Sequence, residues 1–226
     1  MRLLVLGAIA ISLNACALQR GLTPETVASL KGRRLTTMVR RAPPFLPAIP
    51  GKYRVGLGGL IAMSDAGQRL VQENAIADPA VEIARELGDS LGEHYGMRAS
   101  APVLAVVDDD PTQISQANPT VDLVLDVWTD SWSTAPFSSD EGPYRVRYRV
   151  NLRLIDAKVA HPIDGRSGAV IAEGSCACDS EDESLAVTYD QLVADHARRL
   201  KGELDTAVQF CVEDFRSRIL SPAAEP

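Results

Sequence analysis

The sequence lacks any run of about 18 apolar residues, the length that a helix needs to cross a membrane. Positive charge is also scarce, since 23 Lys and Arg stand against 30 Asp and Glu, a net charge of −7. Nucleic-acid-binding proteins need an excess of Lys and Arg to neutralise phosphates, so the composition argues against a nucleic-acid partner. Aromatic residues make up only 5% of the chain, which weakens the case for sugar stacking. The 46% apolar content is that of a folded globular chain.

Catalytic motifs are missing as well. The sequence contains no G-x-S-x-G, H-E-x-x-H, P-loop or kinase signature. A glycine-rich stretch at 55–61 has Ile61 where a dinucleotide loop needs glycine. Acidic runs at 108–110 and 179–183 lack the ligand spacing of a calcium or zinc site. The three histidines are scattered along the chain: His94, His161 and His196. We therefore expect no catalytic residue, no metal and no cofactor.

Two segments, residues 121–132 and 144–156, alternate as half-buried β-strands do. The first has apolar residues on one face and aspartates on the other, and the second has tyrosines and aliphatic residues opposite arginines. Pairing them as a hairpin would set a row of Arg beside a row of Asp on the solvent face. Such pairs contribute only ~0.2–1 kcal/mol each but fix the register. Further strands are expected at 35–40, 103–107 and 168–178.

The same hairpin offers a candidate partner surface. Trp128 and Trp132 would share the face of the Asp row, where they could contact a protein or a glycan. Arg145, Arg147 and Arg149 line the neighbouring strand. They could bind phosphate, an anionic glycan or a lipid head group, or they could pair with the aspartates as a structural element. The facing aspartates favour the structural role.

Helix signals complete the fold prediction. Prolines at 43–50 predict an extended connection, and the apolar stripe from 188 to 219 predicts one continuous helix. Three segments open with a capping residue: Thr23-Pro24, Asp78-Pro79, and Thr188 with Gln191. These patterns predict an α+β fold. Its mixed β-sheet consists of a β-α-β unit followed by an antiparallel meander, with helices packed on one face and a long C-terminal helix.

The first residues have the form of an exported lipoprotein. Arg2 precedes an apolar stretch at 3–13 that is too short to span a bilayer but fits a secretory signal. The stretch ends in Leu13-Asn14-Ala15-Cys16, which resembles a bacterial lipobox. The resemblance implies removal of the signal peptide, residues 1–15, and acylation of Cys16, for example with palmitate. The alternative is an ordinary secretory signal followed by an unmodified Cys.

On the lipoprotein interpretation, residues 16–22 are a lipidated tether, 23–220 a single periplasmic α+β domain, and 221–226 a tail. Each buried acyl CH₂ contributes about 0.8 kcal/mol, so two or three chains anchor the protein at the membrane. Ala17 rather than Asp follows the Cys. By analogy with enteric lipoproteins, this favours the outer membrane, with the domain facing the periplasm.

The remaining cysteines predict a disulfide. Cys176 and Cys178 are two apart on an expected strand, and Cys211 lies on the apolar stripe of the last helix. In an oxidising compartment a bridge from Cys176 or Cys178 to Cys211 is the natural pairing. A metal site beside the acidic run at 179–183 is the alternative, but neither a His nor a further Cys lies within the usual ligand spacing.

The strand and helix motifs resemble those of uncharacterised proteobacterial lipoproteins and of TolB amino-terminal-like domains. The matching segments are Val124–Val127 with Trp132, residues 144–156, residues 172–176, and the final helix with Cys211. The resemblance implies a non-enzymatic envelope lipoprotein, acting as an assembly or structural component of a periplasmic or outer-membrane complex. It would contact an envelope protein or a second copy of itself. The alternative is a lipid- or glycan-binding auxiliary module of an envelope transport system.

Overall fold

The computed structural model describes residues 19–50, 56–100, 103–104, 109–138, 142–160, 167–180 and 182–222. Cys16 and His161 lie outside these ranges. The helices are α1 (Pro24–Ala28), α2 (Gly56–Glu73), α3 (Pro79–Tyr95), α4 (Pro111–Ala117) and α5 (Tyr189–Phe215), with short helical turns η1 (Glu183–Leu185) and η2 (Arg216–Leu220). The strands are β1 (Arg34–Val39), β2 (Leu46–Pro47), β3 (Arg98–Ala99), β4 (Val103–Leu104), β5 (Leu123–Pro136), β6 (Tyr144–Ala160) and β7 (Ser167–Asp179).

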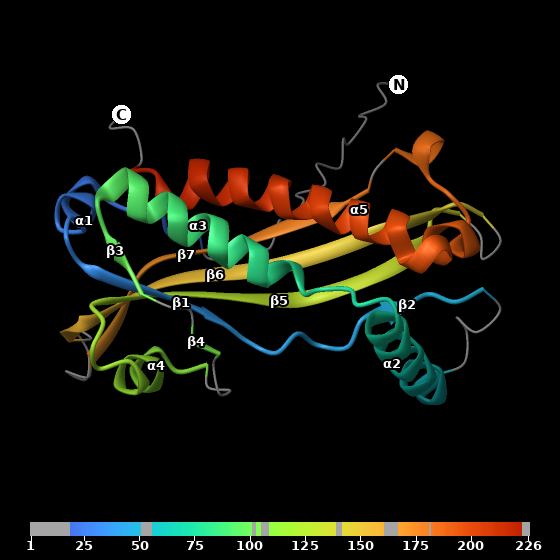
Figure 1. The fold of residues 1–226 in the computed structure, drawn as a ribbon, viewed down its shortest axis with the longest axis horizontal. Helices are drawn as coiled ribbons and strands as arrows, with labels where there is room; N and C mark the ends of the chain where they lie inside the picture. The colour runs from blue at the N-terminus through green and yellow to red at the C-terminus, as the bar shows by residue number, and fades with distance from the viewer. Residues whose placement is uncertain are drawn as a thin grey trace, which may run out of the picture.

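One mixed sheet organises the chain, with the central strand order β3-β1-β5-β6-β7 (Figure 1). β1 runs parallel to β5 after a crossover through α2 and α3, and β5, β6 and β7 form an antiparallel meander. β2 and β4 add short parallel pairings to β5 and β1. The predicted fold class is therefore confirmed. None of the helices within the described ranges is long and apolar enough to cross a membrane.

α3 and α5 cover one face of the sheet and enclose the main core (Figure 1). Asp78 caps α3 by accepting a hydrogen bond from the Ala80 N–H, and Gly96 ends the helix in the left-handed conformation. Tyr148 on β6 is fully buried beneath these helices. The structure joins Cys176 of β7 to Cys211 of α5, one of the two pairings that the sequence left open.

The other face carries a small second core under α4. Ile114 of α4 packs there with Met38, Val124 and Ile155 from the sheet. Asp110 caps the helix by accepting from the Thr112 N–H at 2.9 Å, and Pro111 occupies its first turn. The expectation that helices lie on one face only was therefore wrong, because residues after the acidic turn form an additional helix.

α5 is not the continuous helix that its apolar stripe predicted. Asp195, His196 and Ala197 have positive φ angles of 51°, 55° and 56°, so a left-handed turn interrupts the helix. Each such residue costs roughly 1–2 kcal/mol. Leu192 before the turn and Ala197 within it are both fully buried. Packing of these side chains on the sheet therefore offsets the strain.

One irregularity in β5 changes which side chains share a face. Its pairing with β6 shifts register between Thr129 and Ser131, the mark of an extra residue in the strand. A bulge reverses the alternation of side chains, so Trp128 and Trp132 point to opposite faces. Trp132 lies opposite Tyr148 and is 4% exposed. The prediction that both tryptophans share the face of the Asp row was wrong.

Candidate functional site

A groove of about 550 Å³ lies between α2 and the loop that leads from β1 to β2. We call it the α2 groove. Its loop wall includes Pro43, Pro44 and Phe45, its helix wall Gln68, Val71 and Gln72, and its floor Trp132 and Asp78. Pockets of roughly 300–1,000 Å³ with apolar walls and a few convergent polar groups are the usual form of a binding site.

The proline-rich segment builds the loop wall. Its prolines prevent helix formation, as predicted for an extended connection. The segment pairs with β5 at Leu46 and Pro47, and the Ala48 N–H donates to the Thr134 carbonyl. The Trp132 indole donates a hydrogen bond to the carbonyl of Pro43 at 2.7 Å. The rings of Phe45 and Trp132 meet edge to face with centroids 5.3 Å apart. The loop is thereby fixed over the floor of the groove.

Gly67 sets the position of the helix wall. A Cβ atom at this residue would lie 1.7 Å from the carbonyl oxygen of Phe45. Only a glycine therefore allows α2 to approach the loop backbone this closely.

Asp78 supplies the buried polar group of the floor. Its Oδ1 accepts hydrogen bonds from the Ala80 N–H at 3.0 Å and the Thr129 hydroxyl at 2.5 Å. Its Oδ2 is buried without a hydrogen-bond partner in the described residues. Burial raises the pKa of Asp78, and the bonds from Thr129 and Ala80 offset part of that rise. A buried carboxyl with one unused oxygen marks a position where a ligand could bond.

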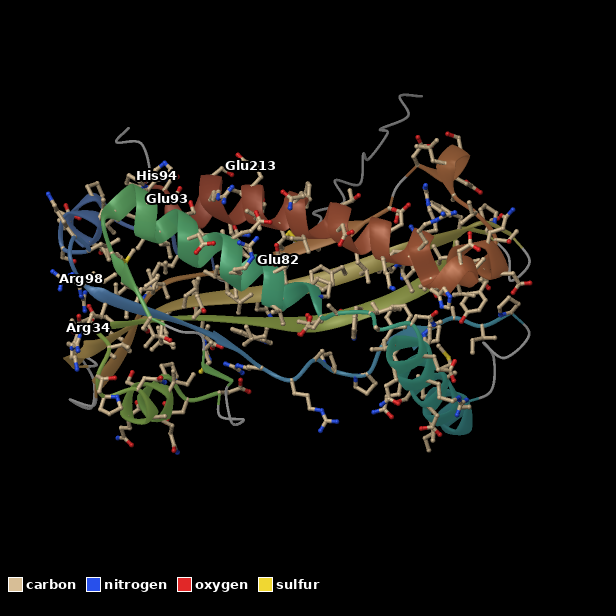
Figure 2. The ribbon with its side chains drawn as sticks, in the orientation of Figure 1. Arg34, Glu82, Glu93, His94, Arg98 and Glu213 are labelled. Atoms are coloured by element: carbon tan, nitrogen blue, oxygen red, sulfur yellow. A yellow bond between two sulfur atoms is a disulfide. The ribbon has the colours of Figure 1, made fainter. Side chains whose placement is uncertain are left out.

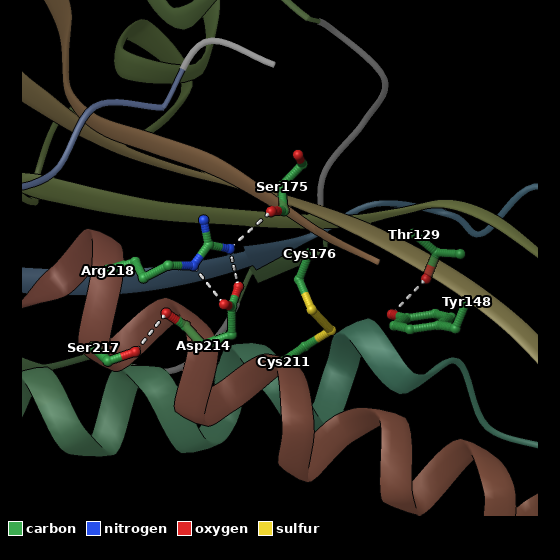
Figure 3. Close-up of a disulfide and its surroundings, with 8 residues drawn as sticks. All are labelled: Thr129, Tyr148, Ser175, Cys176, Cys211, Asp214, Ser217 and Arg218. Carbon is green, nitrogen blue, oxygen red and sulfur yellow. Dashed lines mark hydrogen bonds and ion pairs between the residues drawn. A yellow bond between two sulfur atoms is a disulfide. The ribbon is translucent and has the colours of Figure 1, made fainter. Parts of the chain in front are cut away.

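The hydrogen-bonded chain extends from Asp78 into the core. Thr129 lies 3.1 Å from the Tyr148 hydroxyl, and Figure 3 shows this pair near the Cys176–Cys211 bridge. Burial raises the pKa of Tyr148 far above its usual range, so the phenol stays protonated. These hydrogen bonds connect the floor of the groove to β5 and β6.

Exposed apolar side chains continue the groove along α2. Leu60 is 53% exposed and Ile61 is 66% exposed. Leu60 stands three turns before Val71, and Ile61 stands two turns before Gln68, so all four lie on one side of the helix. In a helix that adds so little to the core, this exposed stripe is typical of an interaction surface.

The opposite face of the sheet holds a buried ion cluster around Asp126. Asp126 is fully buried and accepts hydrogen bonds from Arg40 at 3.1 and 2.5 Å and from Arg153 at 3.2 and 2.8 Å. Both guanidinium groups lie over the Trp128 ring, at 4.2 and 4.9 Å from its centroid. The predicted Asp–Arg pairing thus occurs here, but the prediction that it faces solvent was wrong.

The other predicted arginines do not join this cluster. Arg145, Arg147 and Arg149 lie opposite Ala135, Ser133 and Ser131 because the bulge offsets the two rows. Arg145 stacks on Phe137, Arg147 lies 3.6 Å from Asp179, and Arg149 is exposed. The structure therefore divides the predicted Trp–Arg surface into separate sites. The α2 groove was not predicted; in the sequence its signals are the proline cluster and the apolar residues after Gly59.

Other polar side chains lie away from the groove. Within the described part of the chain, no group of three or more His, Cys, Asp or Glu could hold a metal. Figure 2 shows Arg34 beside Arg98 at one end of the sheet, and His94 near the end of α3. Neither place belongs to the groove. Near η2, Arg218 pairs with Asp214 and reaches the carbonyl of Ser175 (Figure 3).

Comparison with known proteins gives no family for the chain. No family model matches it, and no curated protein matches it. Solved structures that resemble it include the hypothetical protein CT253 of Chlamydia trachomatis, with 8% identity, a TM-score of 0.40 and coverage of 83% of this chain and 95% of that one. Protein XCC0632 of Xanthomonas campestris, from the family DUF330, has 9% identity, a TM-score of 0.35 and coverage of 88% and 90%.

A third similar structure is the lipoprotein GNA1162 of Neisseria meningitidis, with 16% identity, a TM-score of 0.27 and coverage of 79% of this chain and 99% of that one. Likenesses this distant carry no conclusion about function. They also give no support to the predicted resemblance to TolB amino-terminal-like domains.

Proposed function

We propose that this chain is a lipid-anchored protein of the bacterial envelope that has no enzymatic activity and serves as an assembly or structural component. It is held at the outer membrane by acyl chains on Cys16 and faces the periplasm. The lipobox-like Leu13–Cys16 sequence supports the anchor. The Cys176–Cys211 bridge is consistent with an oxidising compartment.

The observation that carries the assembly role is the apolar side of α2 next to the groove. Leu60 and Ile61 are more than half exposed, and the groove beside them is open to solvent and lined in part by apolar side chains. Burial of such side chains by a partner contributes about 25 cal/mol for each Å² removed from water. The partner is an envelope protein or a second copy of the chain.

The path of the tether supports this role because it leaves the groove accessible. Arg20 exchanges backbone hydrogen bonds with Glu173 at the outer edge of β7. Cys16, four residues earlier, can reach no more than about 14 Å from that point. The groove lies on the far side of β5, and it is seven residues further along the strands than Glu173. At standard strand spacings these two offsets place the groove roughly 30 Å from Glu173. The anchor therefore does not compete with a partner for the groove.

Two measurements test the proposal. Growth with radioactive palmitate should label the wild type, and the label should be lost in Cys16→Ser. Chemical crosslinking in intact cells, followed by mass spectrometry, should join α2 to a specific envelope protein or to a second copy. If neither a partner nor self-association is found, the assembly role is wrong, and palmitate that remains on Cys16→Ser contradicts the anchor.

A second candidate function is that of a lipid- or glycan-binding auxiliary module beside an envelope transporter. The volume of the groove and its two aromatic side chains, Phe45 in the loop wall and Trp132 on the floor, favour it. Native mass spectrometry of gently purified protein would reveal a bound lipid or sugar. Such a ligand, lost when the groove is blocked, would support this candidate over the first.

A further inference from the structure

The two walls of the α2 groove differ in chemistry. The loop wall consists mainly of the apolar side chains of Pro43, Pro44 and Phe45, beside the exposed Arg41. The helix α2 presents the exposed amides of Gln68 and Gln72. Each amide carries two donors and one acceptor. An acyl chain would cover these amides without bonding to them, at a cost in desolvation. A ligand with its own amide groups would satisfy them.

The loop wall also offers backbone hydrogen-bonding groups. The Pro43 carbonyl is already bonded to Trp132. Within the described residues, the backbone groups of Arg41 and Ala42 are bonded to no other backbone group. Both residues lie in the loop between β1 and β2 and line the groove. An extended segment laid beside them can pair with these groups as an added strand does.

Asp78 adds a third polar group at the floor. Within the described residues its buried Oδ2 accepts no hydrogen bond, and an unsatisfied buried oxygen is destabilising. After a small movement of the carboxylate toward the groove, a peptide N–H or the N–H of a Gln, Asn, Lys or Arg side chain would supply the missing donor. Next to Asp78, Trp132 and Ile76 form an apolar surface that suits one aliphatic side chain.

We infer that the α2 groove binds an extended peptide segment of a partner protein, with an apolar side chain over Trp132 and an N–H donor directed at Asp78. The inference rests on the proposed assembly role and specifies the chemistry of the partner. Polar groups on both walls and at the floor favour a peptide over a lipid chain, which could use none of them.

The chain contains its own reporter of occupancy. It has 2 tryptophans, and Trp128 lies on the opposite face of the sheet from the groove. The variant Trp128→Phe leaves Trp132, on the groove floor, as the single source of tryptophan fluorescence. Circular dichroism checks that this variant keeps the fold.

The probe is a library of random dodecapeptides displayed on phage, selected against the purified chain without its signal peptide. Peptides that are enriched are synthesised and titrated against the single-tryptophan protein. We expect them to share an apolar residue and a nearby donor residue, and to shift the Trp132 emission. Binding to the variants is measured by titration calorimetry, because a substituted tryptophan would itself fluoresce. The affinity should fall at least tenfold in Gln72→Trp, which fills the groove, and several-fold in Asp78→Asn.

Glu73→Trp is the matched control because Glu73 is the exposed neighbour on the same helix and does not line the groove. Its affinity should stay within twofold of the parent protein. The inference is wrong if no peptide is enriched. It is equally wrong if enriched peptides bind Gln72→Trp with the same affinity as Glu73→Trp. It is also wrong if monomeric lysophosphatidylcholine shifts the Trp132 emission and no peptide does.

Failure of this inference is distinguishable from failure of the proposed function. If crosslinks from α2 to an envelope protein persist unchanged in Gln72→Trp, the assembly role stands and peptide binding in the groove is contradicted. If the wild-type protein crosslinks to no partner, both the assembly role and the inference of peptide binding are wrong.

Discussion

Trp128 and Trp132 lie on opposite faces of the sheet, although only three residues separate them in β5. The register shift between Thr129 and Ser131 reverses the alternation. Trp128 therefore packs with Arg40 and Arg153 beside the buried Asp126, while Trp132 forms the floor of the α2 groove. One extra residue in a strand thus separates an internal ion cluster from the candidate binding site.

Replacing Trp132 should be among the most destabilising changes in the chain. Trp132→Ala removes a buried ring, its packing on Phe45 and its bond to Pro43, with an expected loss of about 3–5 kcal/mol. Urea unfolding followed by circular dichroism measures the loss. Trp132→Phe should lose less because it keeps most of the apolar area. A stability change below about 1 kcal/mol in Trp132→Ala would contradict the position assigned to this side chain.

The buried carboxylate of Asp126 should be needed to hold two arginines. Asp126→Asn removes the buried counter-charge of both arginines, and Arg40 keeps only its ion pair with the exposed Asp109. Breaking a buried ion pair in this way costs about 3–5 kcal/mol. Asp130→Asn, at an exposed position of the bulge, is the control and should change the unfolding free energy by less than about 0.5 kcal/mol. Equal effects of the two substitutions would refute the buried cluster.

Asp78 should make stability fall as pH rises. Its folded pKa lies above its unfolded value because burial disfavours the charged form. The folded state therefore binds more protons between the two pKa values, and the unfolding free energy decreases as pH passes through that window. Asp78→Asn should remove this part of the pH dependence while keeping the helix cap. Urea unfolding from pH 4 to 8 tests it, and parallel wild-type and variant profiles would show that the pKa of Asp78 is not raised.

Gly67→Ala should separate α2 from the loop. The added Cβ would overlap the Phe45 carbonyl, so the helix must move and the groove must widen. Limited proteolysis within residues 56–73 should accelerate several-fold. Gly58→Ala is a matched control on the same helix, where a Cβ meets no atom within 4 Å. It should stabilise the helix by about 0.5–1 kcal/mol. Equal cleavage rates for both variants would contradict the close contact.

The disulfide should join Cys176 and not Cys178 to Cys211. Mass mapping without reducing agent should recover the Cys176–Cys211 peptide pair. Removal of the bridge in Cys176→Ser should cost roughly 3–4 kcal/mol, since the loop spans 35 residues. Cys178→Ser should cost much less because Cys178 is not part of the bridge. A Cys178–Cys211 peptide as the main product would overturn the assignment.

The sequence by itself determined the elements whose signals are local. The strands at 121–132 and 144–156 follow from alternation along a pleated chain, and the starts of α3 and α5 follow from Asp78 and Thr188. Capping and alternation depend on neighbours within a few residues, so they can be read without the fold. The sequence also predicted that Cys211 pairs with Cys176 or Cys178, without deciding between them.

Only the tertiary structure decided the bulge, the left-handed turn in α5, the choice of Cys176 and the α2 groove. The bulge depends on the pairing of β5 with β6, and the turn depends on which α5 side chains can reach the sheet. The groove combines residues from the proline-rich loop, α2 and β5 that are up to 91 positions apart, from Arg41 to Trp132. Contacts between distant segments are set by packing, and no local pattern records them.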